Sequence, residues 1–197
     1  MEQLKEKKRE LRRRILALRD ALTFEERKKK SQAIKSLLFQ LPEFLNARTV
    51  MFFISFRSEV LTEEMIRETI ARKKKVVVPV TDRENHRLIL SELRDYDRDL
   101  VTSTYGIPEP KREKIKEINV DKLDLIIAPG SVFDEKGRRI GYGAGYYDKL
   151  LRHLKREKKV VALAFELQLV DQVPFSPERD IPVDMIITEK RVIRCQQ

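Results

Sequence analysis

Short runs of consecutive apolar residues constrain the fold of this chain more strongly than any other feature of its sequence. The runs occupy residues 50–54, 76–78, 125–128, 160–164 and 185–187. Strands that are apolar at successive positions suit a parallel sheet with both faces covered by helices. Helical patterns over residues 62–71 and 146–158 alternate with these runs. The sequence therefore predicts an α/β fold, a three-layer α/β/α sandwich around a mostly parallel, Rossmann-like sheet.

Two amphipathic helices are expected before the first strand. The first carries one apolar stripe at helical spacing, formed by Leu4, Leu11, Ile15, Leu18 and Leu22. Residues 23–26, Thr-Phe-Glu-Glu, have the form of a capping box that begins the second helix, and Pro42 helps to end it. Residues 87–93 alternate between apolar and polar and predict an edge strand. No segment resembles a linker or a repeat, so we expect a single domain over residues 1–197.

The charge balance favours anionic partners, because 42 basic and 32 acidic residues give a net charge of +10. A nucleic-acid surface interleaves aromatic with basic side chains, whereas the aromatic residues here cluster in the apolar runs and in a glycine-rich segment. We therefore expect no nucleic-acid partner.

The chain lacks an apolar span of about 18 residues and an early run typical of a signal peptide, and Cys195 is its only cysteine. We expect a cytoplasmic monomer without membrane contact or internal disulfide.

A glycine-rich segment marks the expected ligand site. Five of the six glycines lie between Gly130 and Gly145, and three alternate within residues 141–145. Such density indicates positive φ values or close approach of the backbone to a ligand. The segment follows the strand expected to end at Ala128, and ligands bind beyond the carboxyl ends of parallel strands. Because a helix is expected next, the pattern predicts a phosphate site. It matches neither a P-loop nor a dinucleotide fingerprint, so a purely structural turn is the alternative.

Charged residues close to this segment match the needs of a phosphate. Arg138 and Arg139 precede it, and arginine pairs with phosphate oxygens through two N–H groups. Asp148 follows it, and an aspartate can hold the magnesium ion that binds a phosphate. Glu59 follows the first apolar run, where a carboxylate can accept N–H groups of a heterocycle, although an ordinary loop charge fits equally well. Asp180 lies just before the last run, where carboxylates frequently form turns.

Basic residues on the first helix have two interpretations. Lys8 and Arg12 share one face, beside the apolar stripe, and from there they can reach a neighbouring cleft. Lys7 and Arg14 border the other edge of the stripe, so position alone does not single out one pair. The simpler interpretation is a solvated helix face.

A resemblance to a known family rests on two neighbouring segments. Residues 128–134 read Ala-Pro-Gly-Ser-Val-Phe-Asp, and residues 137–148 read Gly-Arg-Arg-Ile-Gly-Tyr-Gly-Ala-Gly-Tyr-Tyr-Asp. They closely resemble the signature of the 5-formyltetrahydrofolate cyclo-ligase family. Residues 8–12, 58–62 and 105–110 are also similar to elements of that family. The resemblance therefore covers nearly the whole chain.

The resemblance implies a reaction and a set of site residues. The reaction would be ATP- and Mg²⁺-dependent conversion of 5-formyltetrahydrofolate to 5,10-methenyltetrahydrofolate, through phosphorylation of the formyl oxygen and attack by N10. Arg139 and Lys8 would be catalytic, and Asp148 and Asp180 would hold Mg²⁺. ATP would be bound by Lys8, Arg12, Arg139, Ile140, Gly141, Tyr142, Gly143, Ala144, Gly145, Tyr146 and Tyr147. The folate would contact Ile54, Glu59, Tyr142, Gly143 and Tyr146. A sugar-phosphate isomerase or an acyl-CoA enzyme on a related sheet is the alternative, because a fold does not fix a function.

Overall fold

A seven-stranded sheet forms the centre of the molecule, in the order β11-β10-β9-β6-β1-β2-β3. The structure is a computed structural model and describes residues 2–102, 108–155 and 157–195. The parallel strands are β1 (Thr49–Met51), β2 (Lys75–Asp82), β6 (Leu125–Ala128), β9 (Lys159–Leu163) and β10 (Met185–Ile187). The antiparallel edge strands are β3 (Arg87–Leu93) and β11 (Val192–Arg194). The predictions of a mostly parallel sheet and of an edge strand over 87–93 are confirmed.

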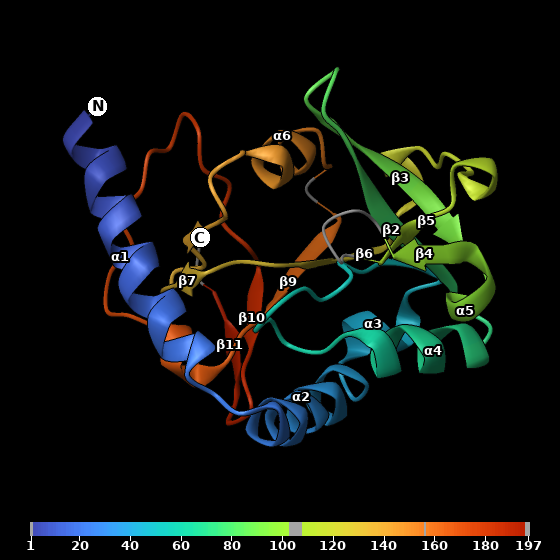
Figure 1. The fold of residues 1–197 in the computed structure, drawn as a ribbon, viewed down its shortest axis with the longest axis horizontal. Helices are drawn as coiled ribbons and strands as arrows, with labels where there is room; N and C mark the ends of the chain where they lie inside the picture. The colour runs from blue at the N-terminus through green and yellow to red at the C-terminus, as the bar shows by residue number, and fades with distance from the viewer. Residues whose placement is uncertain (1, 103–107, 156, 196–197) are drawn as a thin grey trace.

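Alternate residues of each strand pack against helices on opposite faces of the sheet. Val50 and Ile127 lie in the core on the side of α2 (Phe24–Leu38), α3 (Pro42–Asn46) and α4 (Glu63–Ala71). Their neighbours Met51 and Ile126 lie in the core on the side of α6 (Tyr146–Arg152). Figure 1 shows the three helices below the sheet and α6 above it. Because both faces are covered, the strands are apolar at successive positions, and the predicted three-layer arrangement is confirmed.

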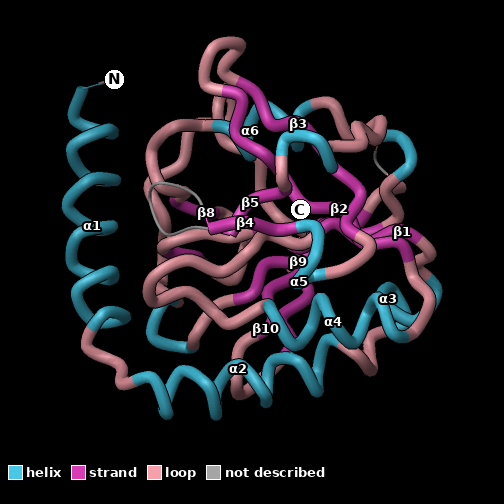
Figure 2. Tube along the Cα trace, turned by 45° about the vertical axis from the view of Figure 1, so that its right-hand side comes forward, coloured by secondary structure: helices cyan, strands magenta, loops and turns pink. Residues whose placement is uncertain are grey.

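Helix α1 (Glu2–Asp20) lies beside this sandwich, as Figures 1 and 2 show. It packs against the 3-10 helix η3 (Glu166–Gln168) and β7 (Val132–Phe133), and its Ile15 joins Val132 and Ile140 in a small apolar cluster. The expected apolar stripe is wrong at Leu18, which is 53% exposed, whereas Arg19 is only 3% exposed. The covered face of α1 thus ends on an arginine.

Helix boundaries follow local signals only in part. Thr23 caps α2, since its side chain accepts from the Glu26 N–H and the Glu26 carboxylate accepts from the Thr23 N–H. The helix ends at Leu38, and Pro42 begins α3 instead of ending α2. Helix α6 ends at Arg152, short of the expected residue 158.

The remaining elements are short. They are α5 (Tyr96–Asp99), β4 (Leu100–Thr102), β5 (Pro108–Pro110), β8 (Arg139–Ile140), and the 3-10 helices η1 (Arg112–Lys114) and η2 (Val120–Lys122). Strand β5 pairs with β4, and β8 pairs with β7, in two small antiparallel sheets. The family-like residues 105–107 lie outside the described residues. None of the helices in the described ranges has the length and apolar character needed to cross a membrane.

Candidate functional site

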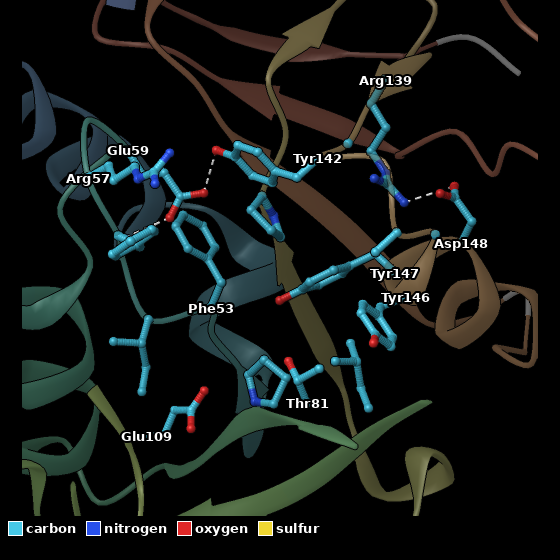
Figure 3. A pocket seen from close by; sticks show the side chains of 18 of the residues that line it. Phe53, Arg57, Glu59, Thr81, Glu109, Arg139, Tyr142, Tyr146, Tyr147 and Asp148 are labelled. Carbon is cyan, nitrogen blue, oxygen red and sulfur yellow. Dashed lines mark hydrogen bonds and ion pairs between the residues drawn. The ribbon is translucent and has the colours of Figure 1, made fainter. Parts of the chain in front are cut away.

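A cavity of about 460 Å³ lies beyond the carboxyl ends of β1 and β6. Its walls come from the segment after β1, from β2 and β3, and from the glycine-rich segment, defined here as residues 141–145. Figure 3 shows side chains from these segments around the cavity. The expected location of the site, at the carboxyl edge of the parallel strands, agrees with this position.

Arg139 is the buried cation of the cavity wall. It is 4% exposed, and its Nη2 donates to Asp148 Oδ1 at 2.9 Å. Its Nε has no hydrogen-bond partner among the described residues. Burial lowers the pKa of the Arg139 guanidinium, whereas the charge of Asp148 acts to raise it. A buried guanidinium with an unused donor is costly, so this wall is suited to receive an anion.

Helix α1 brings two further cations to this region, one to the glycine-rich segment and one to Asp180. Arg12 Nε donates to the carbonyl oxygen of Gly141 at 2.9 Å, and Lys8 Nζ donates to the carboxylate of Asp180. Lys7 and Arg14 are exposed to solvent. The structure therefore selects Lys8 and Arg12 from the basic residues of α1, and the simpler interpretation of a solvated face does not hold for this pair.

The two aspartates predicted to hold metal lie close together and are already engaged. Oδ1 of Asp148 accepts from Arg139 and from the Ile181 N–H at 3.2 Å. Oδ2 of Asp180 accepts from Lys8 and from the Ser176 N–H at 2.7 Å. Over the described part of the chain, no group of three or more His, Cys, Asp or Glu side chains forms a ready metal site. An ion here would need oxygen ligands from its substrate as well.

Glu59 lies in the opposite wall of the cavity and is buried. Its Oε1 accepts from the Tyr142 hydroxyl at 2.5 Å, and its Oε2 accepts from the Phe56 N–H at 2.8 Å. Tyr142 also accepts from Arg19 Nη1 at 2.8 Å. Burial raises the pKa of the Glu59 carboxyl, whereas the bonds from Tyr142 and Phe56 and the charge of Arg19 act to lower it. The site thus joins Glu59 and the glycine-rich segment by a direct hydrogen bond.

The tyrosines after the glycine-rich segment also face the cavity (Figure 3). The Tyr147 hydroxyl is buried and has no hydrogen-bond partner among the described residues. Burial and the charge of Glu59 raise its pKa, so the group is a neutral donor. The Tyr146 ring lies 4.8 Å from the His86 ring, measured between centroids. An aromatic wall with an unused O–H suits a planar, polar ligand.

At two positions of the segment the backbone conformation favours glycine. Gly143 has φ +108° and Gly145 has φ +71°, and Gly145 caps the N-terminus of α6. A Cβ at Gly145 would meet no atom within 4 Å, so only the backbone conformation excludes a side chain there. This confirms that the segment uses positive φ values.

Comparison with known proteins gives a consistent result. The model of the 5-formyltetrahydrofolate cyclo-ligase family matches residues 4–189. The Escherichia coli K12 5-formyltetrahydrofolate cyclo-ligase is 31% identical over 175 residues, 88% of this chain and 96% of that protein. The mouse 5-formyltetrahydrofolate cyclo-ligase is 29% identical over 177 residues, 86% of this chain and 87% of that protein.

A solved structure agrees with these sequence matches. The NMR structure of Aquifex aeolicus 5,10-methenyltetrahydrofolate synthetase superposes with a TM-score of 0.83 at 33% identity, and covers 96% of this chain and 93% of that chain. The chain belongs to the 5-formyltetrahydrofolate cyclo-ligase family.

Most residues assigned by resemblance to this family surround one cavity. Those that line it are Ile54, Glu59, Arg139, Gly141, Tyr142, Ala144, Gly145, Tyr146, Tyr147 and Asp148. Lys8, Arg12 and Asp180 lie behind the glycine-rich segment and Asp148, through the contacts given above. Two further residues predicted to contact a ligand do not line the cavity. Ile140 is buried in the apolar cluster with Ile15. Gly143 lies beside Arg12, whose Nη1 would be 3.7 Å from a Cβ placed there.

The sequence interpretation missed several residues that line this candidate site, and Arg19 is the buried cation among them. It lines the cavity and contacts both Ser58 and Tyr142. A signal was present, because positions 8, 12, 15 and 19 follow the steps of four and three residues that keep one helix face together. Arg19 therefore belongs to the same face as Lys8 and Arg12.

Proposed function

We propose that this protein converts 5-formyltetrahydrofolate to 5,10-methenyltetrahydrofolate and consumes ATP, with release of ADP and phosphate. Membership of the cyclo-ligase family supports the folate conversion. One observation carries the use of ATP: the buried Arg139 guanidinium has an unused N–H and lies in the cavity wall beside the glycine-rich segment. Such a group is suited to the charge that develops on a phosphoryl group in transfer.

The chemistry requires activation of the formyl oxygen, because a formamide oxygen is a poor leaving group. Transfer of the γ-phosphoryl group of ATP to that oxygen breaks the bond between the phosphoryl group and ADP, and forms an iminium phosphate. N10 of the same molecule then attacks the formyl carbon and loses its proton, and the C–O bond breaks as phosphate leaves. Because ring closure is intramolecular, positioning supplies much of the rate.

Lys8, Arg12 and Arg139 would neutralise the phosphates, and the backbone of the glycine-rich segment would lie against them. Lys8 is paired with Asp180, and Arg139 is paired with Asp148. Both cations are thus held near the position where the phosphates would bind. This preorganisation limits the cost of rearrangement during phosphoryl transfer.

The carboxylates beside these cations fit a magnesium ion. Hydrogen bonds engage Oδ1 of Asp148 and Oδ2 of Asp180, one oxygen of each group. In nucleotide sites Mg²⁺ is commonly held by one or two carboxylates together with phosphate oxygens, so the donor set is adequate with ATP present. Asp148 and Asp180 would hold the ion, which would supply charge neutralisation at the phosphate oxygens.

The opposite side of the cavity would receive the folate. Glu59 offers a buried carboxylate to the N–H groups of a pterin, and Ile54 and Tyr146 supply apolar surface for its rings. The formyl group would then lie between the folate wall and the Arg139 wall.

Formation of the methenyl product tests this proposal. We expect the product, followed by its absorbance, only when 5-formyltetrahydrofolate, ATP and Mg²⁺ are all present, with one ADP released for each product. Omission of each component in turn is the control. Product formation without ATP, or ADP release without product, would contradict the proposed reaction.

A further inference from the structure

Two chains of hydrogen bonds begin at the buried guanidinium of Arg19. Its Nε donates to Ser58 Oγ at 3.0 Å, and the Ser58 hydroxyl donates to the carboxylate of Asp20. Its Nη1 donates to the Tyr142 hydroxyl at 2.8 Å, and that hydroxyl donates to Glu59 Oε1 at 2.5 Å. Each chain therefore consists of a cation, a hydroxyl group and a carboxylate. The second chain ends at the cavity.

The guanidinium fixes the direction of the Tyr142 hydroxyl. A guanidinium has donors and no acceptor, so the Tyr142 oxygen accepts from Arg19 and its single proton is directed to Glu59. Tyr142 lies on the cavity rim and is 48% exposed. Without the bond from Arg19, an exposed tyrosine of this kind would sample several orientations. Arg19 thus determines where the Tyr142 O–H points.

The hydroxyl of Tyr142 in turn fixes the plane of the Glu59 carboxylate. One oxygen is held by Tyr142 and the other by the Phe56 N–H at 2.8 Å. An ionised carboxylate has about four acceptor positions, so these two bonds leave capacity for further donors. Because Glu59 lines the cavity, the remaining capacity is available to a ligand.

Arg19 acts on a different part of the site from the other inward cations of α1. Lys8 and Arg12 contact Asp180 and the Gly141 carbonyl, on the side assigned to phosphate. The described bonds of Arg19 go to the hydroxyls that lead to Asp20 and Glu59. Arg19 should therefore contribute to the binding of the organic substrate and not to the binding of the nucleotide.

We infer that Arg19 is a positioning residue for the organic substrate: through the Tyr142 hydroxyl it holds the Glu59 carboxylate in the orientation that receives paired N–H donors of a planar heterocycle. The inference rests on the proposed function for the identity of that heterocycle, a reduced pterin. Neither Arg19 nor Tyr142 needs to touch the reacting atoms.

Four variants and one control test the inference. Tyr142→Phe removes only the hydroxyl, Arg19→Met removes the donors, and Arg19→Lys keeps the charge with a different geometry. The fourth is the double variant of Arg19→Met and Tyr142→Phe. Arg9→Met is the matched control, since Arg9 lies on the same helix, is exposed and pairs with Glu6.

Two measurements are made on each folded variant. Calorimetric titration with 5-formyltetrahydrofolate in the absence of ATP gives Kd, and steady-state kinetics give the KM values for both substrates. We expect Tyr142→Phe and Arg19→Met to raise the folate Kd about tenfold, with the ATP KM changed by less than about twofold. Arg19→Lys should lie between Arg19→Met and the unmodified protein, and Arg9→Met should change neither constant.

The double variant distinguishes a relay from two separate contacts. If Arg19 acts through Tyr142, the double variant is no weaker than the weaker single variant, because the two residues share one interaction. Additive losses, an unchanged folate Kd in Tyr142→Phe, or an equal rise in the ATP KM would overturn the inference. If Arg19→Met does not fold, Arg19→Lys and Tyr142→Phe decide, and an unchanged folate Kd in either would overturn the inference. Failure of this inference can be distinguished from failure of the proposed function. If the proposed function is wrong, the unmodified protein forms no methenyl product. The titration with 5-formyltetrahydrofolate tests the inference alone, because it does not depend on turnover.

Discussion

Lys8 on α1 forms an ion pair with Asp180, a residue 172 positions later in the chain. Both side chains are largely covered, and the Ser176 N–H adds a second bond to Asp180 at 2.7 Å. The pair connects the N-terminal helix to the segment before β10, beside the Arg139–Asp148 pair. Asp180 therefore holds Lys8 in place, although the lysine side chain comes from a helix outside the main sandwich.

Replacement of Lys8 should affect ATP more than folate. We expect Lys8→Ala to raise the ATP KM about tenfold, because a charge-assisted contact to phosphate is lost, with a smaller change in the folate KM. Steady-state kinetics with each substrate varied in turn measure the difference. Lys7→Ala is the matched control, since Lys7 is exposed on the same helix. Equal effects on both substrates would show that Lys8 is not a phosphate ligand.

Loss of the Arg139–Asp148 pair should abolish turnover while the protein remains folded. We expect Arg139→Ala to lower kcat at least about a hundredfold, because the buried cation of the cavity wall, which would stabilise the developing phosphate charge, is removed. Asp148→Asn should have a comparable effect. Because the pair is partly buried, both variants should melt at a lower temperature, and circular dichroism at 25 °C separates this from unfolding. Unchanged activity in either purified variant would refute the role assigned to that residue.

The sequence predicted those features whose cause is local or repeated. The apolar runs report burial on both faces of the sheet, and the site residues of the segment 139–148 are contiguous in the chain. Arg19 was missed because an arginine near a helix end ordinarily points to solvent, and Leu18 was wrongly assigned to the buried face. The wall from β2 and β3, with Thr81 and Leu88, depends on tertiary packing that no local pattern reports.

The conformation of Gly145 should set the stability of the loop. Its φ of +71° is left-handed, and no atom lies within 4 Å of a Cβ placed there. We expect Gly145→Ala to lower the free energy of unfolding by about 1–2 kcal/mol from backbone strain alone, and Gly145→Asn to lower it less, because asparagine tolerates this region. Urea unfolding with unchanged m values provides the measurement. Equal stability of the alanine variant and the unmodified protein would contradict this account.

Cys195 should be slow to react while the protein is folded. Burial and the nearby carboxylates, Asp134 first among them, raise the pKa of its thiol to about 12. Because the thiolate is the reactive form, we expect iodoacetamide at pH 8 to modify the folded protein at least about tenfold more slowly than the protein in urea. Mass spectrometry of timed samples follows the reaction. Similar rates in the two states would show that the thiol is not protected.

The raised pKa of Glu59 makes a prediction about pH. In the folded chain burial shifts this pKa upward, so Glu59 takes up its proton at a higher pH than in the unfolded chain. Between the two pKa values the folded state binds more protons, and stability from this group therefore decreases as pH rises through the window. The Glu59→Gln variant has no titrating group at position 59, so it lacks this pH-dependent contribution to stability.

Comparison of these two proteins isolates the contribution of Glu59. We expect the free energy of unfolding of the unmodified protein, minus that of Glu59→Gln, to fall as pH is raised from about 4 to 7. Affinity for 5-formyltetrahydrofolate should change in the opposite sense, increasing with pH as the carboxylate forms, while Glu59→Gln binds weakly throughout. Urea unfolding and calorimetric titration at each pH supply both curves. A difference in stability that stays level or increases with pH would mean that Glu59 does not titrate as a buried carboxyl, and its role as the pterin acceptor would lose its electrostatic basis.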